Sequence, residues 1–190
     1  MRRAVFLDRD DTLIHRASGA PTGDLGQPDD VALLPNVAEA IRTLARAGYF
    51  LAVFTNQGGV ARAAYPDSAV HAVNARLNQL LREHGAPPID DFRHCPFHPN
   101  GKLPEYTREH PWRKPAPGML LDLARAHSLD LHSSWALGDQ PRDVAAGKSA
   151  GCRTILIAPA NTSCDPAPDF HASDILAAAR HILDAPTRAS

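Results

Sequence analysis

The chain has 190 residues, of which 44% are hydrophobic and 22% charged, and its formal net charge is −1. These values are typical of one globular domain with a sizeable core, so we expect residues 1–190 to form a single domain. A net charge this close to zero argues against a surface that binds nucleic acid or an anionic membrane. The three cysteines form no disulfide pattern, and no apolar run is long enough for a signal peptide or a membrane span. We therefore expect a cytoplasmic protein, and a monomer.

Short, uninterrupted apolar runs recur along the chain and predict strands that are buried on both faces: residues 4–7, 50–54, 134–137 and 154–157. Apolar residues at helical spacing lie between and after these runs, at about residues 37–45, 70–81 and 117–126, from residue 141 onward, and at 174–183. Strands that alternate with helices predict an α/β fold with a doubly wound, Rossmann-like parallel sheet.

Two polar segments rich in glycine and proline interrupt this alternation. Residues 18–30 follow the first strand and are too broken by Gly and Pro to predict structure of their own. Residues 94–113 show no periodicity, and such a long irregular segment is often functional. The segment 94–113 is therefore predicted to be a long functional loop; the family resemblance described below implies that it shapes the substrate site together with residues 18–30 and 58–64.

Two carboxylates two residues apart follow the first predicted strand. Because side chains at i and i+2 of an extended segment point the same way, Asp8 and Asp10 can converge on one ligand while Arg9 points away. Ligands of open α/β sheets bind beyond the carboxyl ends of the strands, and polar residues follow the other strands too. Thr55 comes after the second strand, and Asp139 after the third.

The predicted site therefore gathers several acids in one crevice. Two like charges about 4 Å apart repel by roughly 4 kcal/mol at an effective dielectric constant near 20, so Asp8, Asp10, Asp139 and Asp143 call for a cation. Mg²⁺ suits carboxylate and phosphate oxygens, and Lys114 can supply further positive charge. The hydroxyl of Thr55 and the backbone amides of Asn56, Gln57 and Gly58 can hold phosphoryl oxygens, which makes these three residues candidate substrate ligands.

The order of these pieces resembles the haloacid dehalogenase (HAD) superfamily of phosphatases that use an aspartate nucleophile. Its four motifs are represented here by Asp8-Arg9-Asp10-Asp11-Thr12, Thr55, Lys114 and Gly138-Asp139-Gln140-Pro141-Arg142-Asp143. The resemblance implies a phosphoric monoester hydrolase of small phosphorylated metabolites, built on a single HAD core domain without a large cap.

The resemblance also implies a role for each motif residue. Asp8 would attack phosphorus to form an aspartyl-phosphate, and Asp10 would protonate the leaving oxygen and then activate water. Thr55 and Lys114 would stabilise the transferring phosphoryl group. The Asp8 carboxylate, the Asp10 backbone carbonyl and the Asp139 carboxylate would hold Mg²⁺, while Asp143 would orient Lys114 or a metal-bound water from outside the ligand set.

Within the superfamily, the chain is most similar to the heptose bisphosphate phosphatases and the related histidinol-phosphate phosphatases. The similar strings are Phe6-Leu7-Asp8-Arg9-Asp10, Thr55-Asn56-Gln57-Gly58-Gly59-Val60-Ala61-Arg62, Cys95-Pro96-Phe97-His98-Pro99 and Arg113-Lys114-Pro115-Ala116-Pro117-Gly118-Met119. The heptose branch is favoured, which implies removal of the 7-phosphate of D-glycero-D-manno-heptose 1,7-bisphosphate. It also implies that Arg113 binds substrate, whereas Arg62 is as well explained by a solvent-exposed arginine.

Three positions depart from that group. Asp11 stands where its members have Gly, and Gln140 stands where heptose enzymes often have Lys. Many members hold a structural zinc at the positions that are Cys95, Phe97, His110 and Trp112 here, so two of the four ligands are lost. A substitute set of His94, Cys95, His98 and His110 is conceivable, but we expect a metal-free loop in which Phe97 and Trp112 replace the ion by apolar contact.

Other functions stay open on the sequence alone. Histidinol phosphate or another small sugar phosphate is the alternative substrate. A polynucleotide 3′-phosphatase has a similar second motif, but the chain has no basic stripe. A non-catalytic phosphate-binding domain would not need all four motifs.

Overall fold

The computed structural model describes residues 2–15 and 25–186, so residues 18–24 of the first predicted loop lie outside the described part. One sheet of six parallel strands runs in the order β3-β2-β1-β4-β5-β6. Its strands are β1 (Ala4–Leu7), β2 (Phe50–Asn56), β3 (Asp91–Cys95), β4 (Trp135–Gly138), β5 (Arg153–Ile157) and β6 (Phe170–Ala172). The helices are α1 (Val37–Arg46), α2 (Asp67–Glu83), α3 (Gly118–His127), α4 (Pro141–Ala150) and α5 (Ile175–Asp184).

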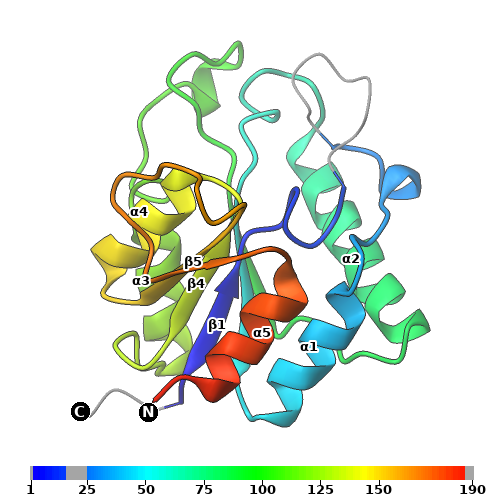
Figure 1. Cartoon of the computed structure of the whole chain (residues 1–190). Coiled ribbons are helices and arrows are strands. Elements are labelled where there is room, and N and C mark those ends of the chain that lie inside the picture. The colour runs from blue at the N-terminus through cyan, green and yellow to red at the C-terminus, as the bar shows by residue number, and fades with distance from the viewer. Residues whose placement is uncertain (1, 16–24, 187–190) are drawn as a thin grey trace.

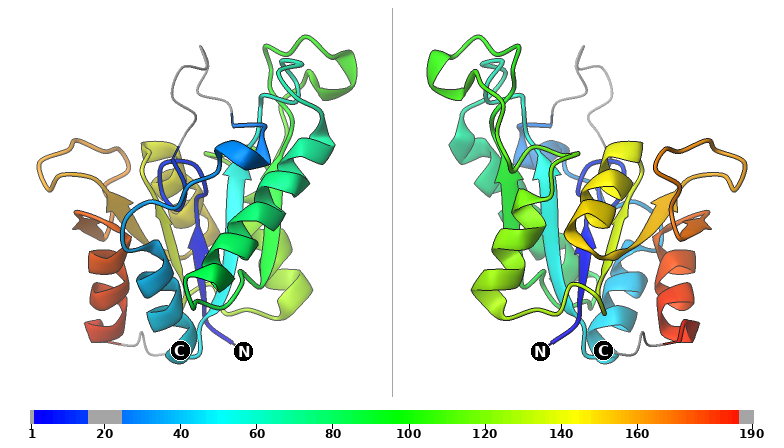
Figure 2. Two further views of the ribbon diagram at one scale, coloured as in Figure 1. Left: turned by 90° about the vertical axis from the view of Figure 1, so that its right-hand side faces the viewer. Right: turned by 90° about the vertical axis from the view of Figure 1, so that its left-hand side faces the viewer.

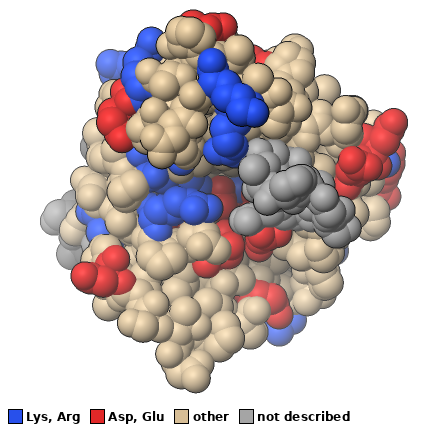
Figure 3. Space-filling view, turned by 90° about the horizontal axis from the view of Figure 1, so that it is seen from above, with Lys and Arg blue, Asp and Glu red and all other residues tan. Residues whose placement is uncertain are grey.

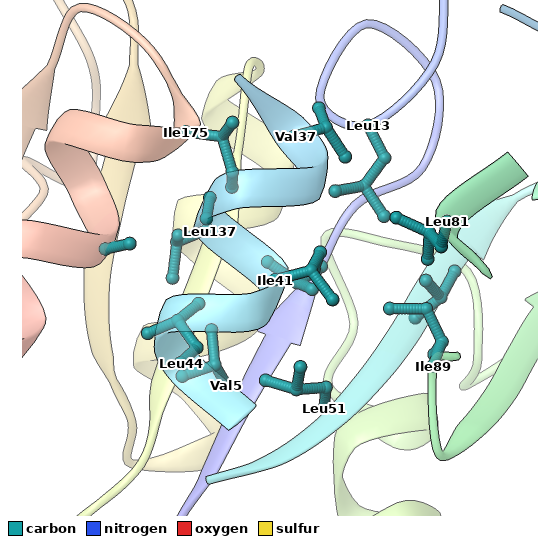
Figure 4. Close-up of a cluster of buried hydrophobic side chains, with 14 of the residues drawn as sticks. Val5, Leu13, Val37, Ile41, Leu44, Leu51, Leu81, Ile89, Leu137 and Ile175 are labelled. Atoms are coloured by element: carbon teal, nitrogen blue, oxygen red, sulfur yellow. The ribbon is translucent and has the colours of Figure 1, made fainter. Parts of the chain in front are cut away.

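The helices cover both faces of the sheet, which confirms the predicted doubly wound α/β fold (Figures 1 and 2). Helices α1, α2 and α5 share one apolar cluster with alternate residues of the central strands, and α3 and α4 share the other. Figure 4 shows Ile41 and Leu44 of α1 lying over Val5 and Leu51 of the sheet. A fully buried aliphatic side chain of this size contributes about 1.5–3 kcal/mol to folding, so these contacts fix α1 on the sheet.

The two outermost strands, β3 and β6, were not predicted. Each pairs with a neighbour on one side only, and their residues are mostly half-buried or exposed. An edge strand therefore needs no continuous apolar run, which was the signal used to find the inner strands. As a result, the irregular segment predicted at residues 94–113 starts two residues later, after Cys95.

Two short 3₁₀ turns also interrupt the predicted loops. They are Pro28–Asp30 and Pro104–Tyr106, and both begin with proline, whose fixed φ suits the first position of a helical turn. The expectation that residues 18–30 hold no structure was therefore wrong at their C-terminal end. Among the described residues, no helix is both long and apolar enough to cross a membrane.

The strand order places the site. β1 lies between β2 and β4, and the chain moves outward in opposite directions on its two sides. Ligands of such sheets bind where the order reverses, beyond the carboxyl ends of the strands. Asp8 directly follows β1, and its amide donates to the carbonyl of Leu137 in β4 at 2.9 Å. This bond holds the start of the first motif against the neighbouring strand.

Candidate active site

Asp8 and Lys114 form a buried ion pair at the centre of this crevice. The Nζ atom of Lys114 lies 2.6 Å from Oδ1 of Asp8 and 2.6 Å from Oδ1 of Asp143, and it donates to the carbonyl of Phe54 at 3.0 Å. Burial by itself would lower the pKa of Lys114, but the carboxylates of Asp143 and Asp8 outweigh it and raise this pKa. Lys114 is therefore held as a cation against two acids.

Asn56 holds the backbone of Lys114 in place. Its side-chain nitrogen donates to the Lys114 carbonyl at 3.1 Å, and its side-chain oxygen accepts from the Lys114 amide at 3.0 Å. The Asn56 side chain thus ties the end of β2 to the segment before α3. The Asn56 side chain is therefore engaged, and if Asn56 binds substrate as predicted, its backbone amide makes that contact.

Three carboxylates meet beside Lys114. One oxygen each of Asp8, Asp139 and Asp143 lie within 4.8 Å of one another, and this group does not contain Asp10. Burial, which outweighs the attraction of Lys114, raises the pKa of Asp8 to about 6, and the charges of Asp143 and Asp10 add to the rise. Burial also raises the pKa of Asp139. Three acids and one ammonium leave two negative charges uncompensated.

This surplus fits a divalent cation with oxygen ligands. The Oδ1 atom of Asp139 is buried and has no hydrogen-bond partner among the described residues. A buried carboxylate oxygen without a partner is costly, and Mg²⁺ binds such oxygens together with phosphate and water. The residues present therefore suit the Mg²⁺ site that was predicted at Asp8 and Asp139.

Asp143 is fixed by the start of α4. Its Oδ2 atom accepts from the Gln140 amide at 2.9 Å in a capping box at this N-terminus. A Cβ atom at Gly138 would lie 2.3 Å from the same oxygen, so only glycine leaves room for the Asp143 side chain here. The strand end, the glycine and the helix cap thus aim Asp143 at Lys114.

The Asp10 carboxylate lies apart from the three acids, between Arg9 and Gln57. The Nε and Nη2 atoms of Arg9 donate to it at 3.2 Å each, and Nε2 of Gln57 donates at 2.7 Å. Arg9 is fully buried, and its Nη1 atom donates to Asn74 of α2 at 3.0 Å. The expectation that Arg9 points away was wrong, because its guanidinium returns to the acid beside it.

Gln57 connects this acid to the second motif. Its Nε2 atom also donates to the Thr55 hydroxyl at 2.8 Å, and its Oε1 atom accepts from the Tyr65 hydroxyl at 2.8 Å. Only 2% of Gln57 is exposed. Its side chain therefore positions Thr55 and Asp10 and is turned toward the protein, so the predicted contact with substrate would fall to the backbone.

Arg113 precedes Lys114 in the chain, and Arg62 and Arg142 lie near enough to act on its charge; we call these three arginines the basic rim. A Cβ atom at Gly58 would lie 3.1 Å from Nη1 of Arg62 and 3.4 Å from Nη1 of Arg113, so both guanidinium groups converge over this glycine. Burial, together with the charges of Arg142 and Arg62, lowers the pKa of Arg113. Figure 3, seen onto the carboxyl ends of the strands, shows basic side chains beside a depression in which acidic atoms are visible.

Arg142 was not recognised from the sequence as a candidate, although it lies inside the fourth motif. Its place at the start of α4, one residue before Asp143, was the available signal. The segment between β3 and α3 rises above the sheet edge (Figures 1 and 2).

Aromatic contacts occupy the part of that segment where the resemblance implied a structural zinc. The ring of Phe97 stacks on His110 at a centroid distance of 4.2 Å, with the Arg108 guanidinium 4.1 Å from its centroid, and the Trp112 ring meets His110 edge-on at 6.1 Å. Within the described residues, no cluster of potential metal ligands includes Cys95, His98 or His110. The alternative ligand set is therefore not brought together, and His94 turns to Asp67 instead, with Nε2 at 2.8 Å from Oδ1.

Asp11 adopts a left-handed backbone conformation with φ of 60°. This region costs a residue with a Cβ atom roughly 1 kcal/mol or more, although Asp tolerates it better than most. The turn geometry explains why Asp can stand where Gly is usual.

Known proteins share this sequence and geometry. A family model described as HAD-hydrolase-like matches residues 111–178. The D-glycero-beta-D-manno-heptose-1,7-bisphosphate 7-phosphatase of Rhodopseudomonas palustris is 39% identical over 150 residues, which span 79% of this chain and 80% of that protein. The D-glycero-D-manno-heptose-1,7-bisphosphate 7-phosphatase of Thermosynechococcus vestitus is 38% identical over 159 residues, which span 82% of this chain and 79% of that protein.

Solved structures of related phosphatases have the same fold as this chain. The D,D-heptose 1,7-bisphosphate phosphatase of B. bronchiseptica, complexed with magnesium and phosphate, has a TM-score of 0.79 at 27% identity, covering 97% of this chain and 99% of that one. A HAD-like protein of Mesorhizobium loti has a TM-score of 0.81 at 35% identity, covering 100% and 89%. The resemblance predicted from the motifs is thus confirmed, and the chain belongs to the HAD-like hydrolases, in the family of the heptose bisphosphate phosphatases.

Proposed function

We propose that this protein is a Mg²⁺-dependent phosphomonoesterase that removes the 7-phosphate of D-glycero-D-manno-heptose 1,7-bisphosphate. The observation that carries the proposal is the buried contact of Asp8 with Lys114, beside the partnerless oxygen of Asp139, at the point where the strand order reverses. The relatives supply the substrate class, because they carry this activity in their names.

The chemistry proceeds in two displacements on phosphorus. A carboxylate oxygen of Asp8 bonds to the 7-phosphorus, the bond from phosphorus to the sugar oxygen breaks, and Asp10 gives that oxygen its proton. Asp10 then takes a proton from water, the resulting hydroxide attacks the aspartyl-phosphate, and inorganic phosphate leaves with Asp8 restored. The Arg9 and Gln57 contacts keep the Asp10 carboxylate beside the reacting centre in both steps.

Charge stabilisation comes from three sources. Lys114 and the Thr55 hydroxyl face the phosphoryl oxygens, and the backbone of residues 56–58 adds amide donors. Mg²⁺ would be held by the carboxylates of Asp8 and Asp139 and by the backbone carbonyl of Asp10, and would supply positive charge to the phosphoryl group.

The basic rim favours a substrate with a second phosphate. The guanidinium groups of Arg62 and Arg113 converge over Gly58, and Arg142 adds a third positive charge near them. Arginine binds phosphate with paired hydrogen bonds, so the rim suits the 1-phosphate that remains after the reaction. Histidinol phosphate has one phosphate and a cationic amine, which such a rim repels.

A substrate panel tests the proposal. We expect the highest kcat/KM for heptose 1,7-bisphosphate, assayed as both anomers, with lower values for histidinol phosphate and p-nitrophenyl phosphate. Removing Mg²⁺ with EDTA should abolish all three activities, and ³¹P NMR should show that the 1-phosphate remains on the sugar. A preference for histidinol phosphate, or turnover without a divalent cation, would contradict the assignment.

The proposal also covers the oligomeric state and the domain organisation of the protein. We expect the protein to act as a monomer, and we assign residues 1–190 to one HAD core domain without a large cap. The three cysteines are all free thiols, as is usual in the reducing cytoplasm. Light scattering of the purified protein tests the monomer.

A further inference from the structure

A second group of potential metal ligands lies outside the site described above, between α2 and β3. Asp67 is the first residue of α2, and His71 follows one turn later on the same helix face. His94 is the penultimate residue of the neighbouring strand β3. The structure thus brings two imidazoles and one carboxylate from two elements to one place.

The Asp67 carboxylate lies between the two imidazoles. Its Oδ1 atom is 2.8 Å from Nε2 of His94, and its Oδ2 atom is 3.7 Å from Nε2 of His71. One ligand atom of each residue lies within 4.8 Å of the others, and the two rings meet edge-on at 5.2 Å. Two ligands of a tetrahedral ion, each at 2.0–2.1 Å, are roughly 3.4 Å apart, so small side-chain rotations bring all three into range.

The group is accessible to an ion from solvent. The side chain of His71 is 68% exposed, that of Asp67 37% and that of His94 15%. A cavity of about 390 Å³ is lined by His71 and His94, and one of about 500 Å³ by Asp67 and His94. Because His71 is exposed while His94 is half-buried, an ion bound between them would keep coordination positions open to water.

An ordinary ion pair elsewhere on the same strand shows the contrast. Asp91 and His127 also form a His–Asp pair, with Nε2 at 2.7 Å from Oδ2, but Arg93 lies 2.9 Å from that carboxylate and neutralises it. Within the described part of the chain, no lysine or arginine pairs with Asp67. The two histidines are its charge partners, and neutral imidazole leaves the carboxylate uncompensated.

We propose that Asp67, His71 and His94 bind a first-row transition-metal ion, foremost Zn²⁺, in a site separate from the catalytic acids. Two imidazole nitrogens and a carboxylate suit Zn²⁺, whereas the oxygen-only set around Asp8 suits Mg²⁺. The bound ion fastens the start of α2 to the edge strand β3. Since no step of hydrolysis involves these residues, the proposal does not depend on the proposed function.

The test is a Zn²⁺ titration of the full chain in saturating Mg²⁺, followed by calorimetry and by the ring-nitrogen NMR signals of histidine. We expect one Zn²⁺ per chain, shifts in the signals of His71 and His94, and a higher Tm. His71→Ala and His94→Gln should each weaken binding at least tenfold. His71 is largely exposed, so its variant should fold even if the other does not.

Three matched variants locate the ion. His127→Ala removes the histidine of the ordinary pair, and Asp139→Asn alters the catalytic acids. Cys95→Ser removes the thiol at the position where the resemblance implied a structural zinc. Each variant should leave Zn²⁺ affinity within about twofold. Zn²⁺ binding that survives His71→Ala unchanged would overturn the proposal. So would binding that is lost in Asp139→Asn or in Cys95→Ser.

Discussion

The acids around Lys114 and the basic rim lie next to each other but are built differently. Asp8 and Lys114 are 4% and 3% exposed, and buried hydrogen bonds to strand ends and a helix cap fix them. The rim arginines come from loops and a helix start and are half-buried or exposed. Positions fixed by the backbone suit the phosphoryl transfer itself, whereas side chains on loops suit the choice of substrate, because loops can change without moving the sheet.

The largest expected effect is at the nucleophile. Asp8→Asn keeps the shape of the side chain but removes the attacking oxygen, so kcat should fall on the order of 10⁴-fold or more. Thermal unfolding should show a fold at least as stable as the wild type, because the change removes a buried charge. Turnover that survives in this variant would contradict the assignment of Asp8.

Lys114→Met should act on both activity and stability. Loss of the cation should lower kcat about 10²–10³-fold. It should also leave the buried acids unpaired, which without Mg²⁺ should lower the free energy of unfolding by about 3–5 kcal/mol. Urea unfolding with and without Mg²⁺ measures this, and Mg²⁺ should restore part of the loss. Lys102→Met, at an exposed lysine, is the control and should change neither quantity.

The rim should separate substrates. Arg62→Gln and Arg142→Gln should each lower kcat/KM for the heptose bisphosphate about 10–100-fold, since a charge-assisted hydrogen bond contributes about 1.5–3 kcal/mol. The same variants should change kcat/KM for p-nitrophenyl phosphate only a few-fold, because it has no second phosphate. Arg76→Gln on the surface of α2 is the control. An equal loss of kcat/KM on both substrates would show that the basic rim acts on the phosphoryl transfer and not on the second phosphate.

The pH dependence of stability and of Mg²⁺ affinity should reflect the ionisation of Asp8. Burial raises the pKa of Asp8 to about 6 from 3.8, so between these values the folded chain binds a proton that the unfolded chain does not. Without Mg²⁺, stability should therefore fall as the pH rises through this window and level off above it. Mg²⁺ needs the ionised carboxylate, so its affinity should fall by up to about tenfold per pH unit below about 6. Asp8→Asn should weaken both trends and leave the part that comes from Asp139, whose pKa burial also raises.

The smallest effect is expected in the aromatic stack. Phe97→Leu removes the ring between His110 and Arg108, which should cost about 0.5–1.5 kcal/mol beyond the lost area. Thermal unfolding measures the loss, while activity on p-nitrophenyl phosphate should stay close to that of the wild type. An unchanged Tm would show that the stack does not stabilise this segment.

The sequence predicted the inner strands and the gathering of the four motifs, because a buried parallel strand has a clear apolar signal and the topology brings strand ends together. It did not predict β3 or β6, whose half-exposed residues lack that signal. Nor did it reveal that Arg9 returns to Asp10, because strand alternation gives the direction of a Cβ atom but not the course of a long side chain. Contacts between distant segments, such as Asn56 with Lys114, were beyond reach for the same reason.

The Gln57 contacts determine which groups donate and which accept in the hydrogen bonds beside the crevice. While it is ionised, the Asp10 carboxylate only accepts hydrogen bonds, so it fixes which end of the Gln57 amide faces it. The Tyr65 hydroxyl must then donate to the other end, and the second amide hydrogen is given to Thr55. Since the Thr55 oxygen already accepts, its own hydrogen is left to point toward the crevice. The contacts of Gln57 with Asp10 and Tyr65 thus set the polarity with which the Thr55 hydroxyl meets phosphate.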